Sequence, residues 1–157
     1  REAPPVIILR ERAQDLWAEA MPIIDQTWRL YDPFPELELD IDQEVYYRAE
    51  DAGNLRCYAA RENRELVGYA VFLVSQSPRR RYLVHAQHDI LHAKPPHGPR
   101  VVPALVRYSE RALQAEGVNL IYHASPIGGR FGELLELMGY KAVNTLHAKV
   151  LGERKGA

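Results

Sequence analysis

The chain has little cysteine, no long apolar run and almost no net charge. Cys57 is the only cysteine among 157 residues, which excludes an intramolecular disulfide and favours a reducing, cytoplasmic compartment. No apolar run approaches the roughly 20 residues that a transmembrane helix needs, and we expect no secretory signal and no membrane contact. A formal net charge of −1 disfavours broad binding to nucleic acid, which needs a basic face. The basic run Arg79–Arg81 is interpreted first as a solvated turn, with a contact to a phosphate or an acidic partner as the alternative.

The rest of the composition is that of a globular protein. Hydrophobic residues make up 46% of the chain and charged residues 26%, and we find neither a repeat nor a low-complexity linker. We therefore expect one domain over residues 1–157.

The order of apolar patterns predicts an α/β fold. Helical spacing covers residues 11–31, where Pro22 is expected to break the pattern into two helices because proline removes a backbone donor. A helix between two strands of one sheet implies a parallel pair, so a mixed sheet with helices on both faces follows. Strands are expected over 6–9, 55–60, 65–74, 82–93 and 118–124, and residues 143–151 are expected to form one strand or a pair of strands. Further helices are expected over 41–52, 100–116 and 131–138.

The second half carries motifs of one known family. A strand ending in Asp89–Pro95 leads into His97-Gly98-Pro99-Arg100-Val101-Val102-Pro103, which aligns with a glycine-rich loop and the start of a helix. The segment Phe131–Tyr140 is similar to that family's late helix and its Leu-Gly-Phe/Tyr ending. From about Leu66 to Leu151 the chain resembles the GNAT superfamily of N-acyltransferases, and its close at Thr145–Leu151 is similar to small GNAT proteins of tailed bacteriophages.

The resemblance implies a GNAT-like fold with a mixed, mostly antiparallel sheet of six or seven strands, and acetyl-CoA as acyl donor. The implied donor-binding residues are Leu91, His92, Ala93, His97, Gly98, Arg100, Val101 and Val102. Free N–H groups at a helix start suit a pyrophosphate. The loop departs from the family pattern, because only Gly98 of three glycines remains and Pro99 has no N–H. A plain strand-to-helix connection is the alternative.

The implied reaction is direct attack of an amine on the thioester. Asp89 is the first candidate for the general base, and His88 and His92 are the next. The tyrosine that commonly acts as general acid is replaced by Leu135, which leaves Tyr140 and Tyr122 as guesses. Cys57 is not needed as a nucleophile and is expected in the core. The alternatives are a surface charge for Asp89 and packing roles for the tyrosines.

All six histidines lie in the second half, which raises the question of a metal site. His88 and His92 would suit zinc on a helix, but four residues of strand span about 13 Å, too far for one ion. No metal is therefore expected.

The acceptor is the least determined part. Acidic residues dominate 32–51, which predicts either a rim that attracts a cationic amine or a solvated surface. The leading hypothesis is an acetyl-CoA-dependent N-acetyltransferase acting on a small-molecule or peptide amine. The alternatives are an impaired acyl-CoA-binding protein, a phage enzyme acting on an aminated nucleobase or a host protein, and an interaction module that does not bind CoA. A homodimer is left open.

Overall fold

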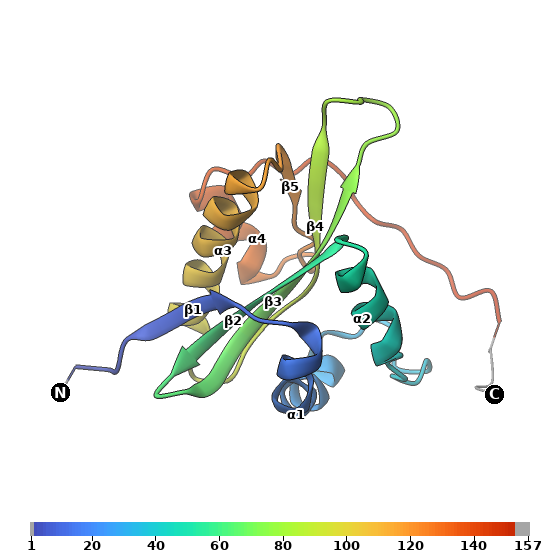
Figure 1. Ribbon diagram of the computed structural model, residues 1–157. Coiled ribbons are helices and arrows are strands. Elements are labelled where there is room, and N and C mark those ends of the chain that lie inside the picture. The colour runs from blue at the N-terminus through green and yellow to red at the C-terminus, as the bar shows by residue number, and fades with distance from the viewer. Residues whose placement is uncertain (1, 153–157) are drawn as a thin grey trace.

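The sheet follows the order of the chain. In the computed structural model, which describes residues 2–152, five strands form one sheet in the order β1-β2-β3-β4-β5 (Figure 1). The strands are β1 Val6–Arg10, β2 Leu55–Glu62, β3 Glu65–Gln76, β4 Val84–Ala93 and β5 Leu120–Tyr122. The first four pair antiparallel and β4 pairs parallel with β5, so the mixed α/β class is confirmed. The prediction of six or seven strands is wrong for the described residues.

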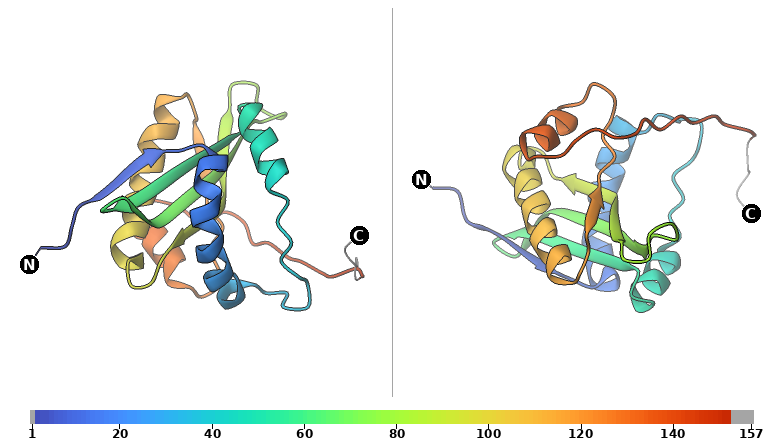
Figure 2. Two further views of the ribbon diagram at one scale, coloured as in Figure 1. Left: turned by 60° about the horizontal axis from the view of Figure 1, so that its bottom comes forward. Right: turned by 90° about the horizontal axis from the view of Figure 1, so that it is seen from above.

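Helices cover both faces, as the pattern predicts. They are α1 Ala13–Tyr31, α2 Gln43–Asp51, α3 Gly98–Ala115 and α4 Arg130–Leu137. Figure 2 shows α1 on one side of the sheet and α3 on the other. The first core cluster joins α1 to residues of β2 and β3, with partly buried residues of α2 against it, and the second joins the opposite side of these strands to α3. Cys57 is buried in the first cluster, where desolvation raises the pKa of its thiol to about 12.

Helix α1 is continuous through Pro22, so the predicted break is wrong. Pro22 lies on the exposed side of the helix, while Ala20 before it and Ile23 after it belong to one buried stripe. Burying that stripe on both sides of the proline outweighs the loss of one backbone hydrogen bond.

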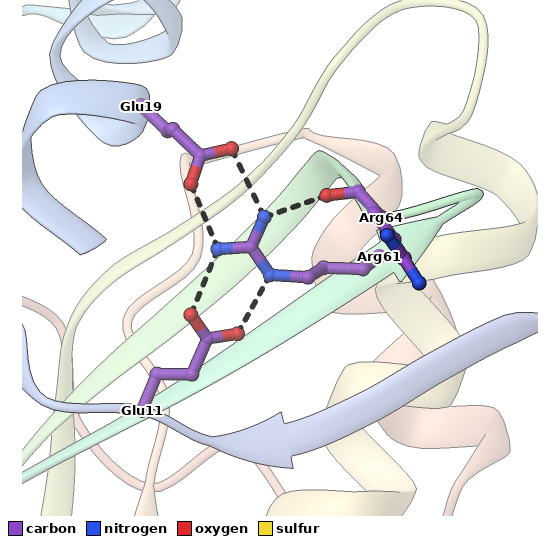
Figure 3. A network of polar contacts seen from close by, with 4 residues as sticks. All are labelled: Glu11, Glu19, Arg61 and Arg64. Atoms are coloured by element: carbon purple, nitrogen blue, oxygen red, sulfur yellow. Dashed lines mark hydrogen bonds and ion pairs between the residues drawn. The ribbon is translucent and has the colours of Figure 1, made fainter. Parts of the chain in front are cut away.

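An arginine clamp holds the start of α1 to the β2–β3 hairpin. Arg61 of β2 donates to both oxygens of Glu11 at 2.8 Å, to both oxygens of Glu19 at 2.9 and 3.0 Å and to the carbonyl of Arg64 at 2.8 Å (Figure 3). Asn63 and Arg64 both have positive φ, as a two-residue hairpin turn requires. The clamp thus supports a strained turn while fixing the helix over the sheet; its hydrogen bonds lower the pKa of Glu19.

The strand predicted over 143–151 does not form. Residues 140–152 have no regular secondary structure, and residues 141–152 are exposed. A strand needs a neighbour for its backbone groups, and within the described chain this segment has none. Sequence pattern gives the β-forming tendency but not the partner.

Candidate functional site

The centre of the candidate site is a bulge in β4. Val71 pairs with Ile90 and Phe72 pairs with His88, so Asp89 between them has no partner in β3. Such an extra residue bends a strand and redirects its side chains. Asp89 lies toward α2, whereas His88 lies toward β5 and α4. Two of the predicted catalytic residues, Asp89 and His88, thus lie on opposite faces of β4, as neighbouring residues of a strand do.

Beyond the bulge, β4 loses its neighbour on the β5 side. β5 pairs only with His85–Gln87, while β4 continues to Ala93. The N–H of Lys94 donates to Val67 of β3 at 2.7 Å. Because backbone groups alternate sides along a strand, the N–H groups of Leu91 and Ala93 point away from β3, where no strand of residues 2–152 pairs. This open edge is the stretch that the resemblance assigns to the donor.

Asp89 is held by a tyrosine that the sequence did not single out. The hydroxyl of Tyr46 on α2 donates to Asp89 Oδ2 at 2.7 Å. Trp17 of α1 packs against Tyr46, with ring centroids 5.8 Å apart, and so fixes that hydroxyl. Burial, and then the hydrogen bond to Asp89, raise the pKa of Tyr46, which keeps its proton on the phenol at neutral pH. Asp89 is itself exposed and so accessible to a second partner.

A small apolar hollow of about 20 Å³ adjoins this pair. It is lined by residues of α1, α2 and the sheet, among them Tyr46, Tyr69 and Ile90. The hydroxyl of Tyr69 is buried and has no hydrogen-bond partner within the described chain. His92 lies beside Tyr69, with ring centroids 6.3 Å apart, and burial lowers its pKa. His92 is therefore neutral at pH 7 on the same face as Asp89.

On the other face, His88 pairs with His123, which follows β5. The two Nδ1 atoms are 2.7 Å apart, and Phe131 of α4 contacts both rings. Burial, and then the nearby imidazole of His92, lower the pKa of His88 to about 4. Burial, and then the imidazole of His88, lower the pKa of His123 to about 3. Two neutral rings can share one N–H, so this pair bridges β4 and β5 where they begin to diverge.

The start of α3 offers few free donors. The N–H groups of Arg100 and Val101 both donate to the carbonyl of His97, and Pro99 has none. The Gly98 N–H has no partner within residues 2–152, and a Cβ added at Gly98 would meet nothing within 4 Å. The Arg100 guanidinium contacts Glu62 and donates to the carbonyl of Pro4 at 3.2 Å, and His97 Nδ1 lies 3.5 Å from the same Glu62. Thus two of the predicted donor-binding side chains, Arg100 and His97, already face a carboxylate.

Gly68 of β3 lets α3 approach the sheet here. A Cβ at Gly68 would lie 2.6 Å from Val101 Cγ1 and 2.9 Å from the His92 carbonyl oxygen. Gly68 pairs with Ala93, so this close approach fixes α3 against the open end of β4. Val101 is fully buried there, and its side chain belongs to the core.

The acidic segment divides into paired and unpaired groups. Glu50 accepts from the N–H of Ala13 at 3.0 Å, and Asp51 pairs with Arg12 at 2.9 Å. Asp42 caps α2 by accepting from the N–H of Glu44. Asp32 accepts from the indole N–H of Trp28 and from the N–H of Phe34. The remaining carboxylates have neither an ion pair nor a side-chain hydrogen bond among residues 2–152; they are Glu36, Glu38, Asp40 and Glu44. This second group has no partner at all within the described residues and can attract a cation.

A metal site and a membrane-spanning helix were two further possibilities to check. Within the described chain, no group of three histidine, cysteine, aspartate or glutamate side chains is arranged to hold a metal ion. In the same residues no helix is long and apolar enough to cross a membrane.

Tyr140 donates its hydroxyl to Glu110 at 2.9 Å. Burial, and then this hydrogen bond, raise the pKa of Tyr140.

Comparisons with known proteins show the fold. No protein-family profile and no curated protein sequence matches the chain. Solved structures do match, among them an aminoglycoside acetyltransferase from an uncultured soil metagenomic sample, in complex with sisomicin. It has a TM-score of 0.74 and 11% identity over 95% of this chain and 97% of that one. The chain shares the fold of this acetyltransferase.

Two further structures support this acetyltransferase fold. A ribosomal-protein-alanine N-acetyltransferase from Brucella melitensis biovar Abortus 2308 has a TM-score of 0.70 and 18% identity, covering 94% of this chain and 100% of that one. A predicted acetyltransferase with acetyl-CoA from Clostridium acetobutylicum has a TM-score of 0.69 and 12% identity, covering 94% and 97%. The GNAT-like architecture expected from the sequence is confirmed at the level of the fold.

Proposed function

We propose that this protein is an N-acetyltransferase that transfers an acetyl group from acetyl-CoA to a primary amine. The observation that carries the proposal is Asp89: an accessible carboxylate, oriented by Tyr46, at a bulge beside an unpaired strand edge in an acetyltransferase fold. Acetyl-CoA is the donor substrate, and no metal takes part.

The proposed chemistry uses the open edge of β4 for the donor and the face that carries Asp89 for the acceptor. The donor's pantetheine arm would lie along Leu91–Ala93, with its phosphates near Gly98 and Arg100. The Leu91 N–H would donate to the thioester carbonyl oxygen as negative charge develops there. The amine would approach from the α1 and α2 face and give up a proton to Asp89, directly or through one water. Its nitrogen bonds to the acyl carbon, the carbon–sulfur bond breaks, and CoA leaves as the thiolate, which is then protonated.

The acceptor is proposed to be a cationic small-molecule or peptide amine. Of the unpaired carboxylates, Glu44 lies on α2, the helix that carries Tyr46, and Glu36, Glu38 and Asp40 lie in the loop before that helix. A field of one sign concentrates ligands of the opposite sign. The structural match to a protein in complex with sisomicin supports a small-molecule acceptor.

A second candidate is an acyl-CoA-binding protein with impaired catalysis. It is favoured by the engagement of Arg100 and His97 with Glu62, and by Leu135 at the position of the usual tyrosine acid. A phage enzyme acting on a modified nucleobase or host protein has no supporting observation beyond the sequence resemblance.

Two measurements separate these candidates. Saturating acetyl-CoA should raise the melting temperature, because a ligand that binds only the folded state stabilises it. Thiol release from acetyl-CoA with a panel of di- and polyamines, aminosugars and peptide N-termini should then show turnover. No thermal shift would refute the donor assignment, and a shift without any thiol release would select the binding protein.

A further inference from the structure

The tip of the β3–β4 hairpin carries positive charge that the proposed reaction does not use. The tip covers residues 77–83 and contains the run Arg79–Arg81. From Leu66 to His88 the chain has no aspartate and no glutamate. All three arginines are exposed, and none of them forms an ion pair within residues 2–152. The charge is therefore concentrated on one short loop and accessible to an anion.

The backbone of this tip is closed by its own hydrogen bonds. The N–H of Arg80 donates to the Ser77 carbonyl at 3.3 Å, and the N–H of Leu83 donates to the Arg80 carbonyl at 2.9 Å, which gives two consecutive turns. The N–H of Ser77 donates to the Leu83 carbonyl at 2.8 Å and closes the base. Pro78 restricts the first turn further, because its ring fixes φ. A loop that is already ordered loses little conformational entropy when it binds a ligand.

A carboxylate near the base of the hairpin is already paired. Asn119 joins this base to the end of α3, since its N–H donates to the carbonyl of Val84 at 2.8 Å. Glu116, the last residue of that helix end, pairs with Arg10 at 3.1 Å and with Arg56 at 2.9 Å. The charge of the tip arginines is therefore not compensated from this side.

An aromatic ring lies beside the three charges. Tyr82 follows Arg81 directly and is 77% accessible. Within residues 2–152 its ring contacts no other aromatic ring. Packing therefore does not explain this side chain. Proteins that bind single strands of nucleic acid combine such features, because bases stack on exposed aromatic rings while arginines bind the phosphates.

The tip lies apart from the proposed reaction site. Figure 1 shows the hairpin projecting beyond the helices. The open edge of β4 is at its Ala93 end, whereas the tip precedes Val84 at the other end. Asp89 lies five residues along the strand from Val84, which is about 17 Å at about 3.3 Å per residue. A ligand on the tip would thus leave Asp89 accessible.

We propose that the tip 77–83 binds single-stranded nucleic acid, with Arg79–Arg81 on the phosphates and one base stacked on Tyr82. A duplex keeps its bases paired and stacked, so it offers the phosphates but no free base for the ring. The surface is small and the net charge of the chain is −1, so we expect weak binding, with a Kd of about 10⁻⁴ to 10⁻⁵ M at low salt. This binding is a property beyond acetyl transfer and does not depend on it.

The first test is fluorescence anisotropy of two labelled oligonucleotides, an oligo(dT) and an oligo(U) of twelve nucleotides, titrated with the full chain over a salt series. The logarithm of the binding constant should fall with the logarithm of the salt concentration, with a slope of about −2, because each phosphate contact on a single strand contributes about −0.7. Binding of either strand supports the proposal, and the tighter one identifies the sugar that is preferred. Absence of binding to both at low salt means a solvated turn and overturns the proposal.

The second test removes the charges. Replacement of all three tip arginines by glutamine (R79Q/R80Q/R81Q) should weaken binding at least 10-fold and bring the salt slope close to zero. The matched control removes the same charge from three exposed arginines that also have no ion pair within residues 2–152; they are Arg29, Arg107 and Arg111. The control should bind within about twofold of the parent, and both variants should keep its melting temperature. An equal loss in the two variants would mean that net charge alone governs binding and overturns the proposal.

The third test concerns the ring. Tyr82→Ala should weaken binding about 10-fold, whereas Tyr82→Phe keeps the stacking surface and should bind like the parent. Tyr31→Ala, at a tyrosine that is 64% accessible elsewhere, is the control and should have no effect. Poly-glutamate should not bind, and a duplex of the same length should compete less well than the single strand. Undiminished binding by Tyr82→Ala, tight binding of poly-glutamate or preference for the duplex would each overturn the proposal, the second by indicating an acidic protein as partner.

Discussion

The two faces of β4 give two neighbouring residues different surroundings. On the α2 face, Asp89 is exposed and held by one hydrogen bond from Tyr46. On the opposite face, His88 is enclosed with His123 and Phe131 and kept neutral by desolvation. Adjacent positions thus carry opposite electrostatic environments. The open face suits proton exchange with a ligand, and the closed face suits packing.

The largest expected effect is on the open face. Asp89→Asn keeps the shape and the hydrogen-bonding reach of the side chain but removes the base, so kcat/KM should fall about 10²-fold or more. The melting temperature should stay within a degree or two of the parent, because Asp89 is exposed. Initial rates of thiol release from pH 6 to 9 provide the measurement. Full activity across that range would show that Asp89 is a surface charge.

A glycine substitution probes the closed face. Gly68→Ala forces a Cβ against Val101 and the His92 carbonyl, so the free energy of unfolding should fall by about 1–3 kcal/mol. Gly98→Ala, where a Cβ meets nothing within 4 Å, is the control and should be neutral or slightly stabilising. Urea denaturation of both variants provides the comparison. Equal stability of the two would mean that α3 does not pack closely on β3.

The histidine pair gives the closed face a pH signature. In the folded chain the pKa of His88 is about 4 and that of His123 is about 3, both below the ordinary value of 6.5. Below pH 6.5 the unfolded chain therefore binds more protons than the folded chain. This stability contribution is complete above pH 6.5 and is lost as pH falls toward 4, by about 3 kcal/mol for each histidine. Urea midpoints from pH 7.5 to 4.5 should show the decline. It should persist in His147→Asn, whose histidine is exposed, and flatten in His88→Gln/His123→Gln.

The smallest effect expected is at the tyrosine that orients Asp89. Tyr46→Phe removes the 2.7 Å hydrogen bond but keeps the ring against Trp17, so kcat should fall about 10-fold. Tyr47→Phe is the matched control, because Tyr47 lies beside Trp17 and has no hydrogen bond to Asp89. A role in packing alone would predict the same small change in both variants. Steady-state kinetics at saturating donor distinguishes these outcomes.

Sequence pattern predicted the elements better than their partners. The α3 stripe of Val101 and Leu105 and the strong strand at 65–74 are visible in periodicity, and both are core in the structure. The break at Pro22 and the strand at 143–151 failed because their outcome depends on tertiary packing. Local sequence cannot report whether a buried stripe continues past a proline or whether a neighbour strand is present.

The candidate site shows the same limit. Asp89 came from the family resemblance, and His88 and His92 came from residue type and their place at the same strand end. Tyr46 and His123 were missed as partners because they lie 43 and 35 positions from Asp89 and His88. Nor could spacing along the chain show that the carboxylate of Glu62, at the end of β2, contacts Arg100 and His97. Contacts over such separations are fixed by strand register, which single-residue patterns do not encode.

The strand order has a consequence for how the chain folds. Because β2, β3 and β4 are consecutive in sequence and adjacent in the sheet, their two hairpins close short loops at little entropic cost. β1 must instead close over the whole α1–α2 stretch, and β5 over α3. Early folding should therefore begin in the β2–β3–β4 meander, with the edges added later. The strand that carries Asp89 would then be built before the helices that give it its two environments.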